Sequence, residues 1–416
     1  MAYQPRSIDD ELDELLSAAP AVAIDGAKGV GKTRTATQRA DSMWLLDDPA
    51  QAELLRADPT FTDAAPGTLL IDEWQRMPQV WDVVRRQVDA GAPAGRFLLT
   101  GSATPSAGVD THSGAGRILS LRMRPLALYE RVGARPSVSI SALLDADPVT
   151  IAGQTDMTAG DYYAAIEASG FPGIYQQPER LRRRLLDAYL QRVIDRDLPG
   201  LGRTVRRPEV LRRWLAAYAA ATSTTTSYSR ILDATTTGDG NQPAKSTTIA
   251  YRDHLTQLWL LDPVPGWRPT RTPLRRLQQA PKHHLADPGL AARLLSLSAR
   301  TLVSAAGAPF AGPLFESLAT LTVRVAAQRA GARVGHLRTR NGDREVDLVV
   351  EGDEGQILGI EVKLAASVGD TDVRHLLWLR EQRPNDVVDL MILTTGSHAY
   401  RRQDGVAVVP LALLGE

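Results

Sequence analysis

The chain has 416 residues, of which 48 are lysine or arginine and 48 are aspartate or glutamate, so its formal net charge is zero. This balance excludes a chain that is basic throughout, and any surface for nucleic acid must be local. The absence of cysteine excludes disulfides, thiolate catalysis and cysteine-ligated zinc. The apolar content of 43%, with no apolar run near the length of a membrane span, predicts a globular, cytoplasmic protein of two or three domains without membrane contact.

A glycine-rich stretch near the N-terminus carries the most specific motif. The apolar run at residues 21–25 predicts a buried strand, GAKGVGKT follows it at residues 26–33, and RTATQRADSMW after it has helical composition. Glycines let a phosphate chain approach backbone N–H groups, and the lysine supplies charge for the β- and γ-phosphates. A loop that only turns the chain is the alternative. In this context the motif predicts ATP binding by Gly26, Ala27, Lys28, Gly29, Val30, Gly31, Lys32, Thr33 and Arg34.

An acidic pair follows the next apolar strand. LLIDEW predicts a strand that ends at Asp72 and Glu73. Downstream of a P-loop, Asp72 is expected to hold Mg²⁺ through water, and the Thr33 hydroxyl is expected to be a second ligand. Glu73 is expected to orient and polarise the attacking water. A solvated turn or helix cap is the alternative for a lone acidic pair.

A third strand also ends in polar residues. GRFLLTGSATP predicts an apolar strand, Phe97–Leu99, followed by Thr100 and Ser102. Carboxyl ends of strands are where open α/β sheets bind ligands, so these hydroxyls are candidate sensors of the γ-phosphate. Ordinary hydroxyls at a strand end are the alternative.

An arginine-rich segment comes next. In HSGAGRILSLRMRPLALYE, Arg117 follows two glycines, and Arg122 and Arg124 alternate with apolar residues as on a strand. An arginine near a transferring phosphoryl group stabilises charge in the transition state. Arg117 is the candidate finger and is expected to act across a subunit interface, which predicts a homo-oligomer formed through the ATPase core. Surface arginines in ion pairs are an equally supported alternative.

The middle of the chain is predicted to be helical. Residues 179–201 carry apolar residues at helical spacing, and their arginines are expected to form a solvated basic face. Helices between residues 209 and 258, broken by Ser/Thr and Gly/Thr segments, precede an apolar strand near Trp259–Leu261. This order is typical of a winged helix, a module that often binds DNA. The Pro- and Arg-rich connector at residues 265–284 is a candidate local basic patch.

The C-terminal third carries a second group of charged residues. GPLFESLATLTVRVAA predicts a helix with Glu316 in its first turn, and REVDLVVE and GIEVKL predict a hairpin with Asp347 in one strand and Glu361 and Lys363 on one face of the next. Carboxylates inside apolar strands are costly unless they meet a cation. Asp followed by Glu-x-Lys is the pattern of the Mg²⁺ or Mn²⁺ site of a restriction-endonuclease-like fold. There Asp347 and Glu361 would bind the metal, Glu316 would complete the site, and Lys363 would position the attacking water. A charge ladder on an exposed hairpin is the alternative.

Taken together, the motifs resemble those of the AAA-superfamily ATP-binding proteins of bacteria and archaea that carry a C-terminal domain of uncharacterised function. The resemblance rests on GAKGVGKT, LLIDEW, LLTGSA, GAGRILSLRMRPLALYE, REVDLVVE and GIEVKL. It implies an α/β protein with four parts. These are a P-loop AAA-type ATPase core with a parallel sheet (1–135), a lid-like helical extension (136–200), a winged-helix-like domain (201–280) and a PD-(D/E)XK endonuclease-like α/β domain (281–416).

Two functions follow from this reading. The first is a Mg²⁺-dependent ATPase that couples nucleotide state to a winged-helix and nuclease-like module acting on DNA or RNA. The alternative is a nucleotide-dependent interaction or regulatory protein whose endonuclease-like domain is a non-catalytic scaffold. Metal ligands are necessary for cutting but not sufficient, so the sequence leaves both open.

Overall fold

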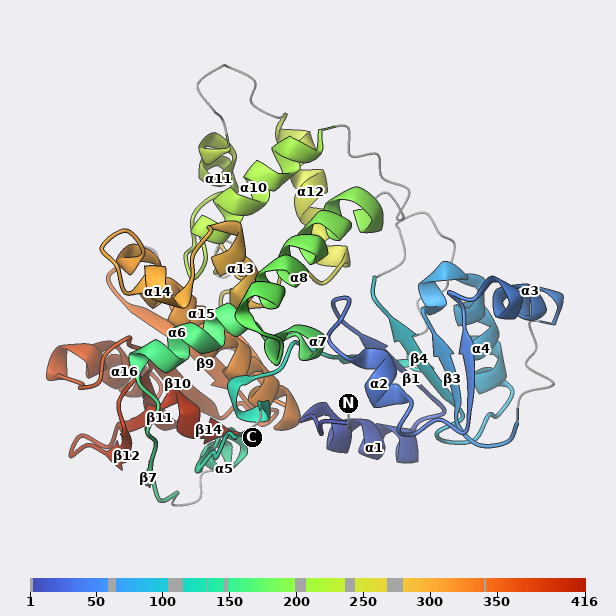
Figure 1. The fold of residues 1–416 in the computed structure, drawn as a ribbon. Helices are drawn as coiled ribbons and strands as arrows, with labels where there is room; N and C mark the ends of the chain where they lie inside the picture. Colours follow the sequence, from blue (N-terminus) through green and yellow to red (C-terminus); the bar gives the residue numbers. More distant parts are fainter. Residues whose placement is uncertain are drawn as a thin grey trace. The chain divides into compact units, whose positions relative to one another are not determined.

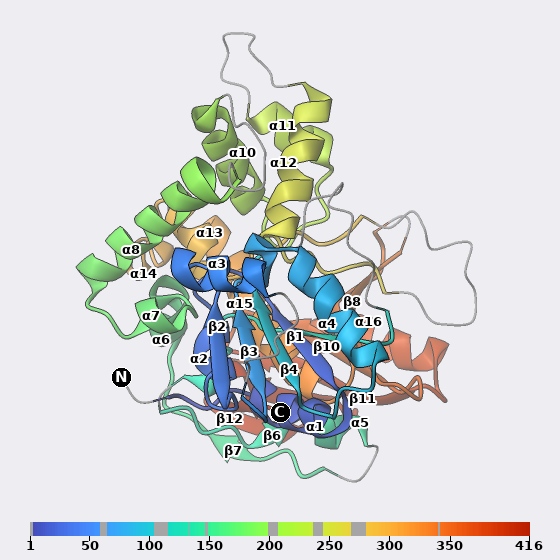
Figure 2. The ribbon, with the colours of Figure 1, turned by 90° about the vertical axis from the view of Figure 1, so that its right-hand side faces the viewer.

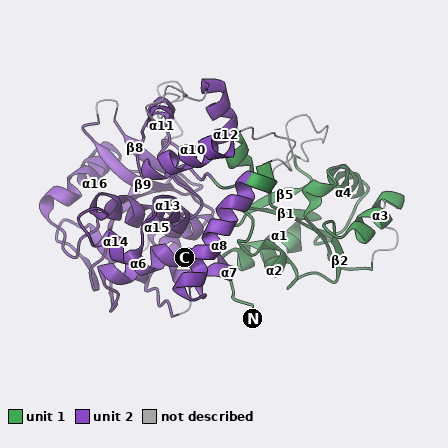
Figure 3. Cartoon of the chain, turned by 45° about the horizontal axis from the view of Figure 1, so that its top comes forward, with its two compact units in different colours: residues 1–125, 195–205, 253–260 green, residues 126–194, 206–252, 261–416 purple. Residues whose placement is uncertain are grey.

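The computed structural model describes residues 3–58, 65–103, 115–131, 133–145, 149–198, 207–235, 244–267, 280–339 and 342–416. The chain divides into two compact units, coloured in Figure 3. Unit 1 comprises Met1–Pro125, Asp195–Val205 and Asp253–Leu260, and unit 2 comprises Leu126–Ile194, Arg206–Arg252 and Leu261–Glu416. No helix in the described ranges is long and apolar enough to cross a bilayer.

Unit 1 is built on a five-stranded sheet in the order β2-β3-β4-β1-β5, whose strands lie side by side in Figure 2. The strands are β1 (Ala21–Asp25), β2 (Ser42–Leu45), β3 (Leu69–Asp72), β4 (Phe97–Gly101) and β5 (Leu119–Arg122). Every neighbouring pair is parallel. All five strands therefore end at one edge, and this carboxyl edge gathers the polar residues that end β1, β3 and β4.

Helices cover this sheet. They are α1 (Ile8–Ala18), α2 (Lys32–Ala36), α3 (Pro49–Ala57) and α4 (Gln79–Asp89), with the 3-10 turn η1 (Trp74–Arg76). Alternate strand residues form one apolar core with α3 and α4, in which the Trp74 and Trp81 rings lie 4.6 Å apart. Such alternation is what a strand with period two produces.

The segment after the P-loop differs from the prediction. It is not helical as far as Trp44, because α2 ends at Ala36 and residues 42–45 form the edge strand β2. The backbone N–H groups of Asp41 and Ser42 both donate to the Thr68 carbonyl, which starts the pairing with β3. Pairing with a neighbouring strand overrides the local helical composition.

Unit 2 contains a seven-stranded mixed sheet in the order β7-β12-β13-β11-β10-β9-β8. Its strands are β7 (Gly153–Gln154), β8 (Arg333–Arg338), β9 (Glu345–Glu351), β10 (Ile357–Val362), β11 (Val387–Thr394), β12 (His398–Arg401) and β13 (Ala407–Pro410), and a separate pair joins β6 (Val138–Ser139) to β14 (Leu414–Gly415). The α-helices labelled in Figure 1 are α5 (Ile140–Leu144), α6 (Ala159–Ala168), α7 (Pro172–Tyr175), α8 (Glu179–Arg192), α10 (Pro208–Ala220), α11 (Tyr228–Ala234), α13 (Pro288–Leu294), α14 (Ala299–Leu302), α15 (Ala308–Arg329) and α16 (Asp370–Gln382). Two 3-10 turns, η2 (Leu128–Glu130) and η5 (Leu411–Leu413), also belong to this unit. The π-helical η3 (Val193–Asp197) and α12 (Lys245–Gln257) have residues in both units.

The C-terminal elements of unit 2 follow a regular order. Helix α15 precedes the antiparallel strands β8, β9 and β10, and helix α16 then leads to β11, which is parallel to β10. Apolar residues of α16 pack on β9, β10 and β11. Helix α15 begins at Ala308, so Glu316 lies more than two turns inside the helix and not in its first turn as predicted.

The middle helices are followed by two isolated antiparallel bridges. Leu261 pairs with Leu285, and Val264 pairs with Lys282. These bridges stand where the sequence predicted a strand near Trp259–Leu261. Most of the predicted basic connector, residues 268–279, lies outside the described residues.

Candidate functional site

The loop after β1 has the backbone geometry that its motif requires. Gly29 and Gly31 adopt left-handed conformations, with φ values of 83° and 108°, which strain any residue that has a Cβ. A Cβ on Gly26 would come within 2.2 Å of the Met123 carbonyl oxygen. The glycines therefore leave backbone N–H groups free of side chains, as the approach of a phosphate chain requires.

Lys32, the first residue of α2, is buried at 6% exposure. Its Nζ donates to the carbonyl oxygens of Gly26 at 2.7 Å and of Ala27 at 3.0 Å. Burial lowers the pKa of Lys32 to about 8, against the opposing charges of Glu73 and other carboxylates. A buried ammonium group whose hydrogen bonds go to carbonyl oxygens is well suited to gain an anionic partner.

Asp25 ends β1 and faces this lysine. Burial raises the pKa of Asp25 to about 6, although the charges of Lys32 and Arg122 and a hydrogen bond with Ser120 oppose the increase. Arg122 lies opposite Asp25 in the register of β1 and β5, and its guanidinium stacks 4.7 Å from the Trp259 ring. The sequence marked Asp25 only as the end of a strand, because a lone acidic residue carries no signal of burial.

The predicted magnesium ligands lie together. Thr33 Oγ1 donates to both carboxylate oxygens of Asp72, at 3.0 and 3.1 Å. Thr100 Oγ1 donates to Oδ1 of the same aspartate from the neighbouring strand β4. Asp72 is buried at 7% exposure, and burial raises its pKa. This chain of oxygen atoms matches the ligands that Mg²⁺ prefers.

The predicted water-orienting residue is also held by polar partners. Glu73 adopts a left-handed conformation, with φ of 56°, a strained backbone that persists where the surroundings fix it. Its Oε2 accepts hydrogen bonds from Ser102 Oγ at 3.0 Å and from Gln75 Nε2, and Gln75 Nε2 also reaches Ser102 Oγ at 3.1 Å. Gln75 was missed by the sequence analysis, since a glutamine in a short 3-10 turn carries no distinguishing pattern.

A buried arginine outside the motif supports the loop. Arg6 is 8% exposed and donates through Nη1 to the Val30 carbonyl and through Nη2 to the Arg124 carbonyl, both at 2.9 Å. Lys28, which the motif includes, is more exposed, and its Nζ lies 3.4 Å from Asp197 Oδ1. No sequence signal marks Arg6, because its role depends on carbonyl groups that folding brings to it.

The candidate arginine finger lies away from its own P-loop. Arg117 precedes β5, whose first residue, Leu119, pairs with Val22 near the start of β1. Arg117 therefore stands near the amino edge of the parallel sheet, whereas the P-loop leaves the carboxyl edge. Its Nε donates to Asp89 Oδ1 at 2.9 Å, and its side chain is 48% exposed. This placement contradicts a role for Arg117 in the site of its own subunit.

Unit 2 brings the predicted C-terminal carboxylates around a lysine. Lys282 is 1% exposed, and its Nζ lies 2.8 Å from Glu316 Oε1, 2.9 Å from Asp347 Oδ1 and 3.4 Å from Glu345 Oε1. The sequence predicted a metal ion among Glu316, Asp347 and Glu361, and the structure places an ammonium group against two of these three carboxylates, Glu316 and Asp347. Among the described residues, no three His, Cys, Asp or Glu side chains are arranged to hold a metal ion.

The rest of this cluster lies on β9, on β10 and on the residue that follows β10. Lys363 Nζ contacts Glu361 Oε1 at 2.9 Å. Asp347 Oδ2 accepts the Val362 N–H at 2.9 Å, and Glu361 Oε2 is buried without a hydrogen-bond partner. Burial and the charge of Asp347 raise the pKa of Glu361. Burial alone would lower the pKa of Lys282, but the charges of its carboxylate partners outweigh burial and hold that pKa above its usual range.

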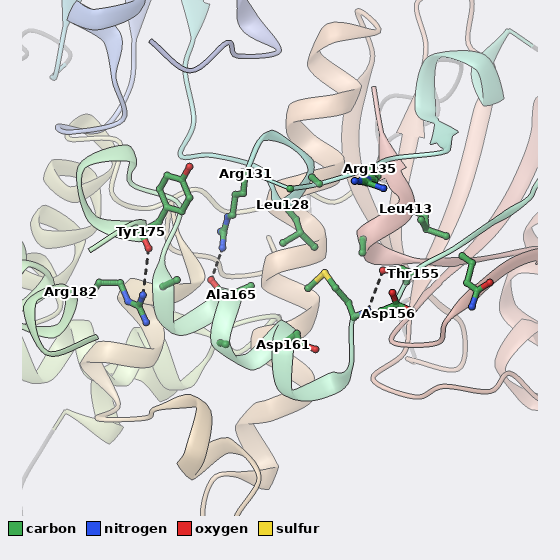
Figure 4. A pocket seen from close by; sticks show the side chains of 17 residues that line it. Leu128, Arg131, Arg135, Thr155, Asp156, Asp161, Ala165, Tyr175, Arg182 and Leu413 are labelled. Atoms are coloured by element: carbon green, nitrogen blue, oxygen red, sulfur yellow. Dashed lines mark hydrogen bonds between the residues drawn. The ribbon is translucent and has the colours of Figure 1, made fainter. Parts of the chain in front are cut away.

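Unit 2 also contains a cavity of about 880 Å³ that none of the predicted site residues lines (Figure 4). Arg131 lines it from one side and donates through Nη1 to the Ala165 carbonyl at 2.6 Å, while its Nε and Nη2 are buried without partners. Arg182 lines another side and donates to the Gln177 carbonyl at 3.0 Å. Arg182 is therefore part of a concave surface, whereas the sequence predicted a solvated basic face.

Three family descriptions match the chain. Residues 18–132 match an AAA domain, residues 159–301 a domain of unknown function (DUF8612), and residues 311–414 a domain of unknown function (DUF4143). The chain is 26% identical over 423 residues to an uncharacterized protein of Mycobacterium tuberculosis, and equally to one of Mycobacterium bovis, with 99% of this chain and 84% of each relative covered.

Two solved structures also show similarity. The Walker-type ATPase PABY2304 of Pyrococcus abyssi is 15% identical, with a TM-score of 0.39 over 69% of this chain and 94% of that chain. A chain of the Drosophila ORC bound to DNA is 13% identical, with a TM-score of 0.20 over 66% of this chain and 90% of that chain. The loop described above lies within residues 18–132, the segment that is similar to an AAA domain.

Proposed function

We propose that unit 1 binds ATP with Mg²⁺ and hydrolyses it. The observation that carries the proposal is that two sets of hydrogen-bonded side chains lie at the carboxyl edge of the sheet. One joins Thr33, Asp72 and Thr100, and the other joins Glu73 to Ser102. Binding alone would not need a carboxylate that is held in place beside the metal ligands, whereas hydrolysis does.

Each residue has a chemical task in this proposal. Lys32 exchanges its carbonyl partners for β- and γ-phosphate oxygens, and Thr33 and Asp72 would hold Mg²⁺, the latter through water. The metal ion neutralises charge on the phosphates when it is bound. Glu73 accepts a hydrogen bond from the attacking water and orients it in line with the γ-phosphate, and Ser102 and Gln75 fix the direction of its carboxylate.

Arg117 completes the site of a second copy in this proposal. An exposed guanidinium near the amino edge of the sheet does not serve its own P-loop, but it is available to a neighbouring subunit. Exchange of the exposed Asp89 partner for a phosphate would cost little, because surface ion pairs contribute little stability. The protein would then be a homo-oligomer formed through the AAA domains.

Unit 2 is proposed to respond to the nucleotide. Its order of one helix, three antiparallel strands, a second helix and a parallel fourth strand supports an endonuclease-like fold for residues 281–416. The helices α10 to α12 with the two bridges support a winged-helix-like part, and binding of DNA or RNA belongs to this proposal. The second candidate is a regulatory interaction protein with a non-catalytic C-terminal domain, which the buried Lys282 favours.

Two substitutions test ATP hydrolysis. Lys32→Ala should abolish ATP binding, measured by calorimetry, because the triphosphate loses its main counter-charge. Glu73→Gln should bind ATP with wild-type affinity and hydrolyse it at least about 100-fold more slowly in a phosphate-release assay. Glu53→Gln is the matched control, since it makes the same chemical change at an exposed position of α3 outside the loop and should change neither result. Normal turnover in Glu73→Gln would refute the assigned role of Glu73.

A further inference from the structure

The buried Lys282 stands where the sequence pattern expects a metal ion. Its Nζ lies 2.8 Å from Glu316 Oε1 on α15 and 2.9 Å from Asp347 Oδ1 on β9. A third carboxylate, Glu345, lies 3.4 Å away. The Lys282 ammonium group donates hydrogen bonds to Glu316 and Asp347 and forms a longer ion pair with Glu345, so its charge is matched by three carboxylates.

The position of Lys282 is fixed by its backbone. Its N–H donates to the Val264 carbonyl and its carbonyl accepts from the Val264 N–H, both at 2.9 Å. The side chain is 1% exposed, so Nζ cannot turn to solvent without opening the surrounding structure. Two backbone hydrogen bonds and a buried side chain therefore hold the Lys282 ammonium group among these carboxylates.

A divalent ion and this ammonium group exclude each other. Mg²⁺ lies about 2.1 Å from its oxygen ligands, so an ion that bridged Glu316 and Asp347 would need the volume that Nζ fills. The other oxygen of Asp347 already accepts the Val362 N–H at 2.9 Å. Electrostatic repulsion between the Lys282 ammonium group and a divalent ion bound to the same carboxylates adds to this steric conflict.

We propose that Lys282 is the resident cation of this cluster, so that the native chain binds no divalent ion there and does not cut nucleic acid by metal-dependent hydrolysis. The cluster instead joins the segment around Lys282 to α15 and β9 through buried ion pairs. Glu361 Oε2 is buried without a hydrogen-bond partner. The described carboxylates are not arranged to hold a metal ion as they stand, so a metal site here would need both removal of the ammonium group and a shift of Glu316, Asp347 and Glu361 toward one another.

The test uses the full chain without nucleotide. Asp72→Asn is included in every variant so that the P-loop holds no metal. Mn²⁺ is titrated while free Mn²⁺ is followed by electron paramagnetic resonance. The background chain should show no saturable binding. Adding Lys282→Ala should create a site for about one Mn²⁺ per chain, and its Tm should rise with Mn²⁺ concentration. Adding Asp347→Asn to Lys282→Ala should remove both effects.

Two results would overturn the proposal. One is saturable Mn²⁺ binding by the background chain that disappears with Asp347→Asn. The other is a folded Lys282→Ala variant that binds no Mn²⁺. Lys282→Met, which keeps the length of the side chain without its charge, separates loss of packing from loss of charge. If neither Lys282 variant folds, the background titration still decides, because binding that is lost with Asp347→Asn refutes the proposal and the absence of such binding supports it.

Discussion

The pH dependence of the free energy of unfolding can be used to test the electrostatics of Asp25, the residue that ends β1 before the P-loop. Burial raises its pKa from 3.8 to about 6. The folded protein therefore retains the proton of Asp25 at a higher pH than the unfolded chain does. The stability that Asp25 contributes is present below pH 3.8 and is lost as the pH rises through about 6. Since one pKa unit corresponds to about 1.4 kcal/mol, the ionised carboxylate costs up to about 3 kcal/mol at pH 7.

Asp25→Asn removes this cost, because asparagine resembles the protonated acid. We expect the free energy of unfolding to increase by about 1 to 3 kcal/mol at pH 7 and to change little near pH 4. Urea unfolding of the nucleotide-free protein between pH 4 and pH 8, followed by tryptophan fluorescence, measures the difference. Asp47→Asn, the same chemical change at an exposed position of unit 1, is the control. A gain that is equal at pH 4 and pH 7, or a loss at pH 7, would refute the reasoning.

Three further substitutions test the contacts around the loop. Thr100→Val should lower the free energy of unfolding by about 1 to 3 kcal/mol in calorimetry, because buried Asp72 loses a donor; an unchanged Tm would contradict this. Ser102→Ala should lower kcat about tenfold with little effect on KM, since Glu73 loses one of its two positioning bonds; an unchanged kcat would show that Gln75 suffices. Arg117→Ala should leave the Tm unchanged and lower ATP turnover about 1000-fold in the assembled oligomer; wild-type turnover at high protein concentration would exclude the finger.

The sequence marks the parts of the candidate nucleotide site whose chemistry depends on local spacing. The P-loop, the acidic pair after β3 and the hydroxyls after β4 are each contiguous with one strand, and parallel pairing then brings the three strand ends together. Gln75 and Arg6 could not be predicted in this way. Their roles depend on partners such as Ser102 and the Val30 carbonyl, which only the folded chain brings within hydrogen-bond distance.

The C-terminal cluster shows a different limit. The pattern of Asp347, Glu361 and Lys363 indicated carboxylates that need a cation, since isolated charges inside a sheet are too costly to bury. The pattern cannot identify that cation. A bound metal ion is not encoded as a residue of the chain. Lys282 is far from the hairpin along the chain, near the end of the predicted basic connector. An ammonium group satisfies the same electrostatic requirement as a metal ion, but it cannot activate water or polarise a phosphate. The identity of the buried cation therefore determines whether the proposed endonuclease-like domain could carry out metal-dependent hydrolysis.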